Sequence, residues 1–368
     1  MKASCPREAL LSACQLVSAA IPTREVRPIL KNIKAVATND RFTLMATDLE
    51  IGICLDVRGL QVTDPGEAIL PASKMISILR ENRDDELLIT CDASSCTVQG
   101  AASNFDLPTE DPSQFPDWPT FTEEKYHEMT AGVLREMIRR VIFAAADDAA
   151  RYSLTGVLWE LEGEKLNLVA TDGRRLAVTT GMATPQGGHA TTGQTPVVPT
   201  KAMSLLERNL VDDPDALVKI SIRHNDVLFR TERATIYSRL VEGRFPSYRD
   251  YLPKKFTGKA TVQASAFMAA VRQAAIMADD ETKRVAFRFD KGTLTLEAQG
   301  PTSGRSKVVM EIVFEGKPVS VNFNPAFVVE VLRVLPTDAE PVIELGGPGD
   351  PALFKCGPDY QYLVMPLT

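Results

Sequence analysis

The segment FTLMATD, residues 42–48, is followed 124 residues later by LNLVATD, residues 166–172. Both segments are apolar runs that end in the same Ala-Thr-Asp sequence. A weaker third copy, LTLEAQG, occupies residues 294–300. Solenoid units are much shorter, roughly 20–50 residues. We therefore interpret each copy as part of a whole domain, so that the chain repeats one domain three times.

Two helices accompany each copy of this strand. The first is amphipathic and is predicted from ALLSACQLVSAAI (9–21), VLREMIRRVIFAA (133–145) and FMAAVRQAAIMA (267–278). The second begins at a proline, a residue favoured in the first turn of a helix, in PASKMISILREN (71–82), PTKAMSLLERNL (199–210) and NPAFVVEVLRVL (324–335). The other segments are short β-rich runs. The predicted fold class is α+β, with three similar domains that each pack two helices on antiparallel sheets.

Two proline-rich segments suggest the domain boundaries. PTEDPSQFPDWPTFTEE (108–124) and GRFPSYRDYLPKKFTGK (243–259) cannot sustain a helix or a central strand. They predict domains at 1–122, 123–254 and 255–368, each of a usual domain size.

Composition excludes several classes of protein. The 368 residues carry a formal net charge of -7, which argues against a protein that grips nucleic acid with its whole surface. No apolar run approaches the ~20 residues of a membrane span, and the N-terminus lacks a signal-peptide pattern. We expect a cytoplasmic protein without membrane contact. The six cysteines form no CxxC pair and are expected to be reduced.

Basic residues fall on the polar faces of the predicted helices. In the helix at 133–145, the apolar stripe comprises Val133, Leu134, Met137, Ile138 and Val141. The basic positions opposite or flanking such stripes are Lys74, Arg80, Arg135, Arg139, Lys201, Arg208 and Arg333. They are either ordinary solvated residues or, if equivalent helices line one surface, a positive lining inside an acidic body.

The usual catalytic signatures are absent from the sequence. His127, His189 and His224 show no metal-ligand spacing, and no phosphate-binding loop or nucleophile motif occurs. We expect no cofactor and no metal. Asp172 is a candidate catalytic carboxylate, with Arg174 or Arg175 beside it. Its recurrence as Asp48 in the first copy favours a turn-capping role instead.

Three segments together resemble one known family, the bacterial DNA polymerase III beta subunits, or sliding clamps. They are ARYSLTGVLWELEGEKLNLVATDGRRLAV (150–178), VEGRFPSYRDYLP (241–253) and YLVMPLT (362–368). The resemblance implies a non-enzymatic head-to-tail homodimer that closes a ring around double-stranded DNA, with helices inside. It also implies binding of the polymerase III alpha subunit, the clamp loader and other proteins with clamp-binding peptide motifs. A ring holds DNA by topology, so a modestly positive lining is enough.

The resemblance also assigns a partner-peptide pocket. Its residues are Leu154, Thr171, Gly173, Arg174, Arg175, Leu176, Pro246, Val364, Met365, Pro366 and Leu367. Such apolar side chains suit short linear motifs. For Leu154, Leu176 and Val364 the alternative is plain core packing. Asp250, Tyr251 and the terminal Thr368 depart from the family pattern, which leaves the preferred motif open.

The subunit contact implied by the resemblance places Phe105 and Leu107 against Ile276 and Met277. Lys74 would meet acidic groups in well-known relatives, but the facing segment here is Gly304-Arg305-Ser306-Lys307, so that ion pair and the dimer's stability stay open. Arg24, Arg151 and Tyr152 match positions near the duplex. The alternative function is an interaction scaffold that keeps the peptide groove without closing a ring.

Overall fold

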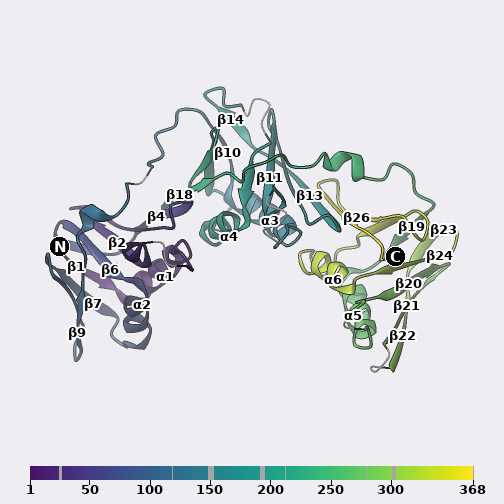
Figure 1. The fold of residues 1–368 in the computed structure, drawn as a ribbon, viewed down its shortest axis with the longest axis horizontal. Coiled ribbons are helices and arrows are strands. Elements are labelled where there is room, and N and C mark those ends of the chain that lie inside the picture. Colours follow the sequence, from purple (N-terminus) through teal and green to yellow (C-terminus); the bar gives the residue numbers. More distant parts are fainter. Residues whose placement is uncertain are drawn as a thin grey trace. The chain divides into compact units, whose positions relative to one another are not determined.

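The computed structural model describes residues 1–24, 27–117, 119–147, 153–190, 195–211, 213–279, 281–300 and 304–367 (Figure 1). The chain forms two compact units. Unit 1 comprises Met1–Arg135, Ala183–Gln194 and Lys201–Leu240, and unit 2 comprises Glu136–Met182, Thr195–Thr200 and Val241–Thr368. Helices lie on antiparallel sheets in both units, which confirms the α+β class.

Unit 1 contains a nine-stranded and a five-stranded sheet. The larger has the order β14 (Thr184–Gln186), β10 (Tyr126–Thr130), β16 (Leu217–Ile222), β17 (Asp226–Arg230), β18 (Ala234–Arg239), β4 (Ile51–Val57), β3 (Phe42–Thr47), β2 (Asn32–Ala37), β6 (Gly66–Pro71). The smaller has the order β5 (Gln61–Asp64), β1 (Lys2–Pro6), β7 (Glu86–Cys91), β8 (Ser95–Gln99), β9 (Asn104–Pro108). Helices α1 (Arg7–Ser18) and α2 (Ala72–Glu81) pack on each other.

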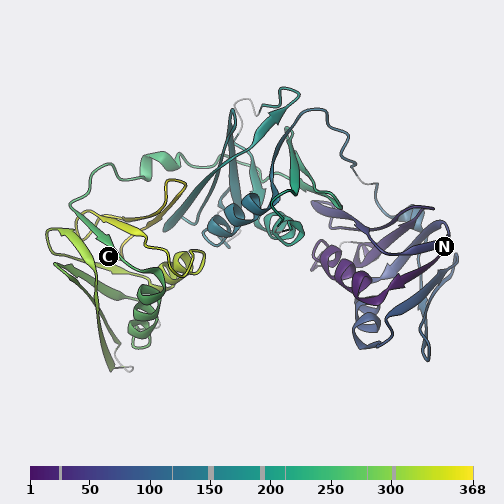
Figure 2. The ribbon, with the colours of Figure 1, turned by 180° about the vertical axis from the view of Figure 1, so that it is seen from behind.

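Unit 2 also contains two antiparallel sheets. The nine-stranded one has the order β15 (Val197–Pro199), β11 (Gly156–Glu162), β12 (Lys165–Thr171), β13 (Arg175–Met182), β27 (Tyr360–Val364), β26 (Ala352–Cys356), β25 (Val342–Leu345), β19 (Gly258–Thr261), β23 (Val313–Gly316). The four-stranded one has the order β22 (Gly304–Glu311), β21 (Thr293–Gly300), β20 (Val285–Asp290), β24 (Val319–Phe323). Helices α5 (Ala264–Ala275) and α6 (Pro325–Arg333) pack together (Figure 2).

Each nine-stranded sheet joins strands from two copies of the sequence repeat. In unit 1, β4 pairs with β18, and in unit 2, β13 pairs with β27, both antiparallel. These backbone ladders bind the copies together along a whole strand. The middle copy is consequently divided between the two units, although it is one repeat in the sequence.

All six predicted helices are confirmed. Helices α3 (Ala131–Ile142) and α4 (Thr200–Asn209) complete the set, and Pro71 and Pro199 directly precede α2 and α4, whereas Pro325 opens α6. One residue of the predicted apolar stripe is misplaced, because Val133 is 47% exposed. The core contacts of α3 come from Leu134, Met137, Ile138 and Val141, whose spacing of three and four residues keeps them on one face.

The cysteines differ from the expectation at one pair. Cys91 and Cys96 lie opposite each other in the β7–β8 ladder, and their sulfur atoms are within bonding distance. The expectation of six free thiols is therefore wrong for this pair. The strand register explains why, since it brings two residues that lack CxxC spacing face to face with 4.0 Å between their Cα atoms.

Candidate functional site

The turn between β12 and β13 carries the Thr-Asp pair that recurs in the sequence. Asp172 Oδ1 accepts hydrogen bonds from the backbone N–H of Arg174 (2.8 Å) and Arg175 (3.0 Å), and Thr171 Oγ1 accepts one from Gly173 N–H (3.1 Å). Gly173 has φ +86°, a left-handed conformation that glycine adopts without strain. The carboxylate is therefore used to hold the turn, as its recurrence in the sequence predicted.

The first copy builds the same turn between β3 and β4. Asp48 Oδ1 accepts from the N–H of Glu50 (3.0 Å) and Ile51 (2.7 Å), and Thr47 Oγ1 accepts from Leu49 N–H (2.9 Å). Here the left-handed position is Leu49, with φ +77°. The turn is thus fixed by the Thr-Asp side chains, with or without glycine.

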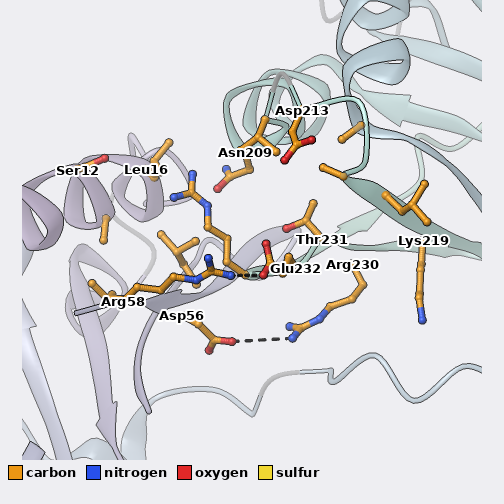
Figure 3. A pocket seen from close by; sticks show the side chains of 18 of the residues that line it. Ser12, Leu16, Asp56, Arg58, Asn209, Asp213, Lys219, Arg230, Thr231 and Glu232 are labelled. Atoms are coloured by element: carbon orange, nitrogen blue, oxygen red, sulfur yellow. Dashed lines mark ion pairs between the residues drawn. The ribbon is translucent and has the colours of Figure 1, made fainter. Parts of the chain in front are cut away.

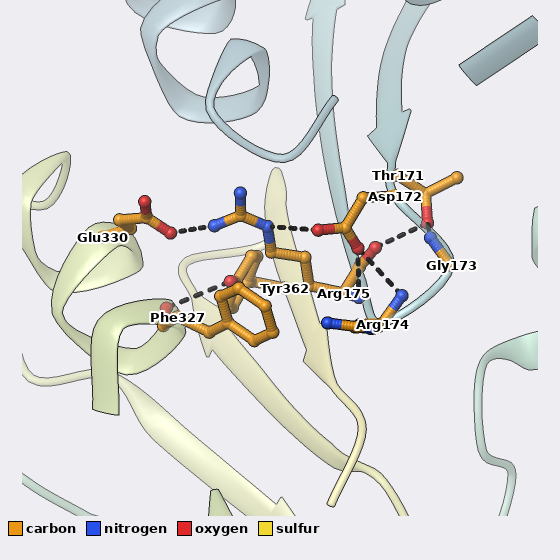
Figure 4. A network of polar contacts seen from close by, with 8 residues as sticks. All are labelled: Thr171, Asp172, Gly173, Arg174, Arg175, Phe327, Glu330 and Tyr362. Atoms are coloured by element: carbon orange, nitrogen blue, oxygen red, sulfur yellow. Dashed lines mark hydrogen bonds and ion pairs between the residues drawn. The ribbon is translucent and has the colours of Figure 1, made fainter. Parts of the chain in front are cut away.

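Arg175 lies at the centre of a buried polar network (Figure 4). Its side chain is 10% exposed, and its Nε is 3.1 Å from Asp172 Oδ2 while its other side pairs with Glu330. The guanidinium lies over two aromatic rings, with 4.5 Å to the centroid of Phe327 and 5.7 Å to that of Phe143. Glu330 and Phe327 belong to α6, so Arg175 ties the β12–β13 turn to that helix.

Leu176 faces the opposite side of the sheet, because side chains alternate along a strand. It lies across from Leu363 of β27 and belongs to an apolar cluster within unit 2. The buried members are Leu158, Val169, Leu176, Val197, Val241, Phe245, Tyr248, Leu353 and Leu363. Half-buried apolar side chains pack against them, namely Leu154, Val178, Leu252 and Phe256. This apolar cluster has a buried floor and a partly exposed rim.

The 3₁₀ turn Tyr248–Tyr251 (η4) is anchored to β11 beside this cluster. Arg249 binds both oxygens of Glu160, at 2.7 and 2.6 Å, and Tyr248 Oη donates to Glu160 Oε2 at 2.9 Å. Burial raises the pKa of Glu160, but the hydrogen bonds from Arg249, Tyr248 and Asn167 outweigh it and hold that pKa below its ordinary value. Glu160 is consequently an anchored anion that fixes η4 against the cluster.

The structure brings most of the predicted pocket residues to this region, on two faces. Leu154 and Leu176 are in the apolar cluster, and Thr171, Gly173 and Arg174 form the adjoining turn. Pro246, Pro366 and Leu367 are half-buried. Met365 is 40% exposed, and its N–H donates to Arg174 O at 2.9 Å. Arg175 and Val364 are buried and pair with each other in the β13–β27 ladder.

Several residues of the apolar cluster were missed at the sequence level. Phe245, Tyr248 and Leu252 come from the VEGRFPSYRDYLP segment, whose alternating aromatic and proline residues were the available signal. Leu363 carries no local signal, since it is one apolar residue in a buried strand. Tyr251, which departs from the family pattern, is 62% exposed at the end of η4.

The predicted basic positions of unit 1 differ in their surroundings. Arg24, Lys74, Arg80 and Arg208 are exposed. Lys201 lies 2.6 Å from Asp48, so its charge is locally balanced. Arg135 is half-buried, and its Nε has no hydrogen-bond partner among the described residues.

In unit 2, the two predicted basic positions on α3 and α6 come together. Arg139 and Arg333 are exposed and line a cavity of about 460 Å³ that Glu136 and Glu330 share. Acidic side chains are thus interleaved with the basic ones, and the surface is not uniformly positive. Arg151 and Tyr152, also predicted near the duplex, lie outside the described residues.

Each of the four sheets has two edge strands in the described chain, and β9 in unit 1 and β22 in unit 2 are two of these. Phe105 on β9 is 38% exposed and Leu107 is buried. Ile276, just after α5, is 71% exposed, and Met277 is half-buried. Exposed strand edges are templates for pairing with another chain.

Two histidines that are distant in sequence meet in unit 1. The Nδ1 atoms of His127 and His189 are 2.7 Å apart, and His189 Nε2 is 3.2 Å from the carbonyl oxygen of Ile222. The two rings contact each other directly, in an edge-on arrangement with 4.9 Å between their centroids. Among the described residues no cluster of three or more His, Cys, Asp or Glu suits a metal, and no described helix is long and apolar enough to cross a membrane.

Comparison with known proteins covers the whole chain. Models of the N-terminal, central and C-terminal domains of the DNA polymerase III beta subunit match residues 1–119, 128–247 and 249–367. The chain is 30% identical to the beta sliding clamp of Pseudomonas putida, over 98% of each protein. It superposes on the DNA polymerase III subunit beta of Pseudomonas aeruginosa with a TM-score of 0.89 and 28% identity, covering 100% and 99% of the chains. A structure of that organism's sliding clamp bound to griselimycin gives 0.90 and 27%, with the same coverage.

Proposed function

Because this chain belongs to the DNA polymerase III beta subunit family and is a DNA sliding clamp, we propose that it encircles duplex DNA as a head-to-tail homodimer and tethers the replicative polymerase. The observation that carries the function is the run of three family domains over residues 1–119, 128–247 and 249–367, together with the whole-length similarity to a beta sliding clamp. The protein is a non-catalytic processivity factor. Asp172, which the sequence offered as a candidate catalytic carboxylate, caps the turn between β12 and β13.

The proposed dimer joins β9 of one protomer to β22 of the next. Such a contact uses different surfaces on the two protomers, which is the head-to-tail type that closes rings. Phe105 and Leu107 occupy one face of β9, and Ile276 and Met277 follow α5 on the helix side of β22. Burying these side chains against each other removes the exposed apolar surface of Phe105 and Ile276 from water.

Charge on the other face of the two strands supports the same pairing. Asp106 is exposed on β9, while Arg305 and Lys307 are exposed on β22. Glu297 lies 3.4 Å from Arg305 and 3.9 Å from Lys307, so two cations share one anion within the chain. We propose that Asp106 of the next protomer supplies the second anion. This arrangement would replace the Lys74 ion pair of well-known relatives.

The DNA-facing set is proposed to be Arg24, Lys74, Arg80, Arg135, Arg139, Arg151, Tyr152, Lys201, Arg208 and Arg333. Acidic side chains lie near three of its members, with Asp48 beside Lys201, and Glu136 and Glu330 in the cavity that Arg139 and Arg333 line. Weak phosphate contacts leave a duplex free to slide, whereas a wholly basic surface would bind it tightly.

The proposed site for partner peptides is the apolar cluster around Leu176 with its half-buried rim and the adjoining Gly173–Arg174 turn. Buried apolar floors with adaptable rims suit short motifs from several partners. We propose the polymerase III alpha subunit and the clamp loader as such partners. Arg175 is excluded from direct contact in this proposal, because its guanidinium is engaged by Asp172, Glu330 and Phe327.

The domain limits are proposed at 1–122, 123–254 and 255–368. The break between the matched family domains at 119–128 supports the first limit, whereas the second break, at 247–249, lies a few residues before the second limit. The protein is proposed to act in the cytoplasm.

The decisive experiment loads the protein, with a clamp loader, onto nicked circular DNA and isolates the complex by gel filtration in 0.5 M salt. Encirclement predicts that the protein is retained on the circle and lost when one restriction cut makes the DNA linear. Equal loss from both forms in high salt would indicate ordinary electrostatic binding. The alternative is a scaffold that does not close a ring. It is favoured by the basic residues of β22, which cannot form the ion pair that Lys74 makes in well-known relatives. This alternative predicts monomers at every concentration in sedimentation equilibrium.

A further inference from the structure

A cavity of about 750 Å³ lies wholly within unit 1 (Figure 3). Its walls are α1, the end of β4, the turn between β17 and β18, and the segment that follows α4. Cavities that hold small ligands and peptide segments usually measure ~300–1,000 Å³. None of its lining belongs to the peptide site around Leu176.

Two buried polar atoms in this lining lack partners among the described residues. Asn209 is 1% exposed, and its Nδ2 donates to Leu205 O at 2.8 Å, which fixes the orientation of the amide. Its Oδ1 is buried without a donor, and Nε of Arg233 is buried without an acceptor. Figure 3 shows Asn209 at the end of its helix, with Leu16 on one side and Asp213 on the other. Buried polar groups are nearly always satisfied, so this pair requires an explanation.

The remaining charges of the lining are mostly balanced by one another. Asp56 lies 3.9 Å from Arg230, and Arg58 pairs with Glu232. Lys219 lies over the ring of Tyr126, 4.8 Å from its centroid. These groups have internal partners and do not call for a charged ligand.

The segment after α4 supplies an apolar patch and two acids. Val211 is 43% exposed and Leu217 is 49% exposed, and both line the cavity. Asp213 and Asp215 are exposed on the same segment. An apolar group with a cation beside it would match this wall.

We propose that the cavity binds a short extended peptide segment of a partner protein, in which an apolar residue is followed by a basic one. An extended residue presents its own N–H donor and C=O acceptor on the same edge of the strand. Its carbonyl would accept from Arg233 Nε–H, and its N–H would donate to Asn209 Oδ1. The apolar side chain packs on Val211 and Leu217, and the basic one lies beside Asp213 and Asp215.

Both orphan atoms are covered in this structure, so the peptide must displace part of the wall. Figure 3 shows the Arg58–Glu232 pair between Asn209 and the Asp56–Arg230 pair. The side chains of Arg58 and Glu232 are 67% and 80% exposed. Exposed ion pairs contribute little stability, which makes this pair easy to move. The proposal does not depend on ring closure.

The test is a titration of the full chain, labelled with ¹³C at Leu and Val methyl groups, with acetyl-Ala-Leu-Lys-Ala-amide followed by NMR. We expect saturable shifts of the Val211 and Leu217 methyl signals. Two matched probes, one N-methylated at Leu and Lys and one with Glu in place of Lys, should each bind at least tenfold more weakly. No saturable shift at millimolar peptide, or equal binding of the N-methylated probe, would overturn the proposal.

A pair of variants tests the assigned donor. Arg233→Lys keeps the charge but removes Nε–H and should weaken binding at least fivefold. Arg230→Lys makes the same change at a lining residue that already has a partner and should bind as the parent protein does. Identical affinity of the Arg233→Lys and parent proteins would overturn the assignment. Retention of Arg233→Lys on circular DNA, measured on the same sample, reports separately on the clamp function.

Discussion

Replacing Arg175 by methionine should destabilise unit 2 without directly removing a peptide contact. The change removes a guanidinium that is 10% exposed and leaves Asp172 and Glu330 facing each other without it. Breaking a buried ion pair by removing one partner costs roughly 3–5 kcal/mol. Asp172 keeps its two backbone donors and Glu330 is 32% exposed, which allows it to turn to water. We therefore expect Arg175→Met to lower the free energy of unfolding of unit 2 by about 3 kcal/mol, the low end of that range.

Matched variants isolate the contribution of Glu330 to the free energy of unfolding. Glu330→Gln keeps the shape of the side chain and leaves Asp172 to balance the guanidinium, so it should cost about 1 kcal/mol. The double variant should cost less than the sum of the two changes, since neighbouring groups are not additive. Arg174→Met, at the exposed neighbouring position, is the control and should leave the free energy of unfolding within about 0.5 kcal/mol of the parent.

The assay is urea unfolding followed by the fluorescence of Trp159, which is fully buried in unit 2. A Trp118→Phe background removes the other tryptophan of the chain. A loss of 3 kcal/mol corresponds to a fall of about 6–12 °C in the unfolding temperature of a unit of this size. Unchanged unfolding of Arg175→Met together with a tenfold loss of peptide affinity would refute the reasoning, because Arg175 would then be a peptide ligand.

Three further outcomes are expected. The double variant Ile276→Ala, Met277→Ala should give monomers with unchanged circular dichroism. Val313→Ala, at another exposed apolar position, is the control and should leave the dimer intact. Sedimentation equilibrium measures both, and a double variant that stays dimeric would contradict the proposed interface. Burial lowers the pKa of His189 from 6.5, so folding favours its neutral form, and this contribution to the free energy of unfolding is lost as pH falls below about 6.5. His189→Gln should therefore reduce the fall in the urea midpoint between pH 7 and pH 5. An unchanged pH profile would show that His189 does not cause that fall. Burial raises the pKa of Cys14 to about 12, so iodoacetamide at pH 8 should label it only in urea, and mass spectrometry that finds rapid labelling of the native protein would contradict its burial.

The helices and the repeated strand were predictable because their signals are local. Apolar spacing along α3 and a proline at the start of α2, α4 and α6 require only neighbours in the sequence. The Thr171–Asp172 turn was equally accessible, since its hydrogen bonds span four residues. Such features are decided by the backbone within one or two turns.

The candidate site was only partly predictable, because it depends on which face of a strand a residue occupies. Arg175 and Leu176 are adjacent in the sequence and both were assigned to the pocket, yet strand alternation sends them to opposite sides of the sheet. Glu330, which engages Arg175, is 155 residues away. The contact of His127 with His189 likewise results from the pairing of β10 with β14, which no spacing rule anticipates.

The duplicated turn shows how two copies of one sequence have diverged in their tolerance of change. At Leu49 a left-handed backbone carries a side chain, and that side chain packs on the apolar group of Ile29, Leu30, Ile69 and Phe115. Glycine at the matching position, Gly173, is free of backbone strain but contributes no packing. Glycine at 49 would relieve the left-handed backbone and lose that packing, whereas a side chain at 173 would introduce strain that the turn does not have at present. Mutational tolerance should therefore be higher in the first copy's turn than in its duplicate, even though their hydrogen bonds are the same.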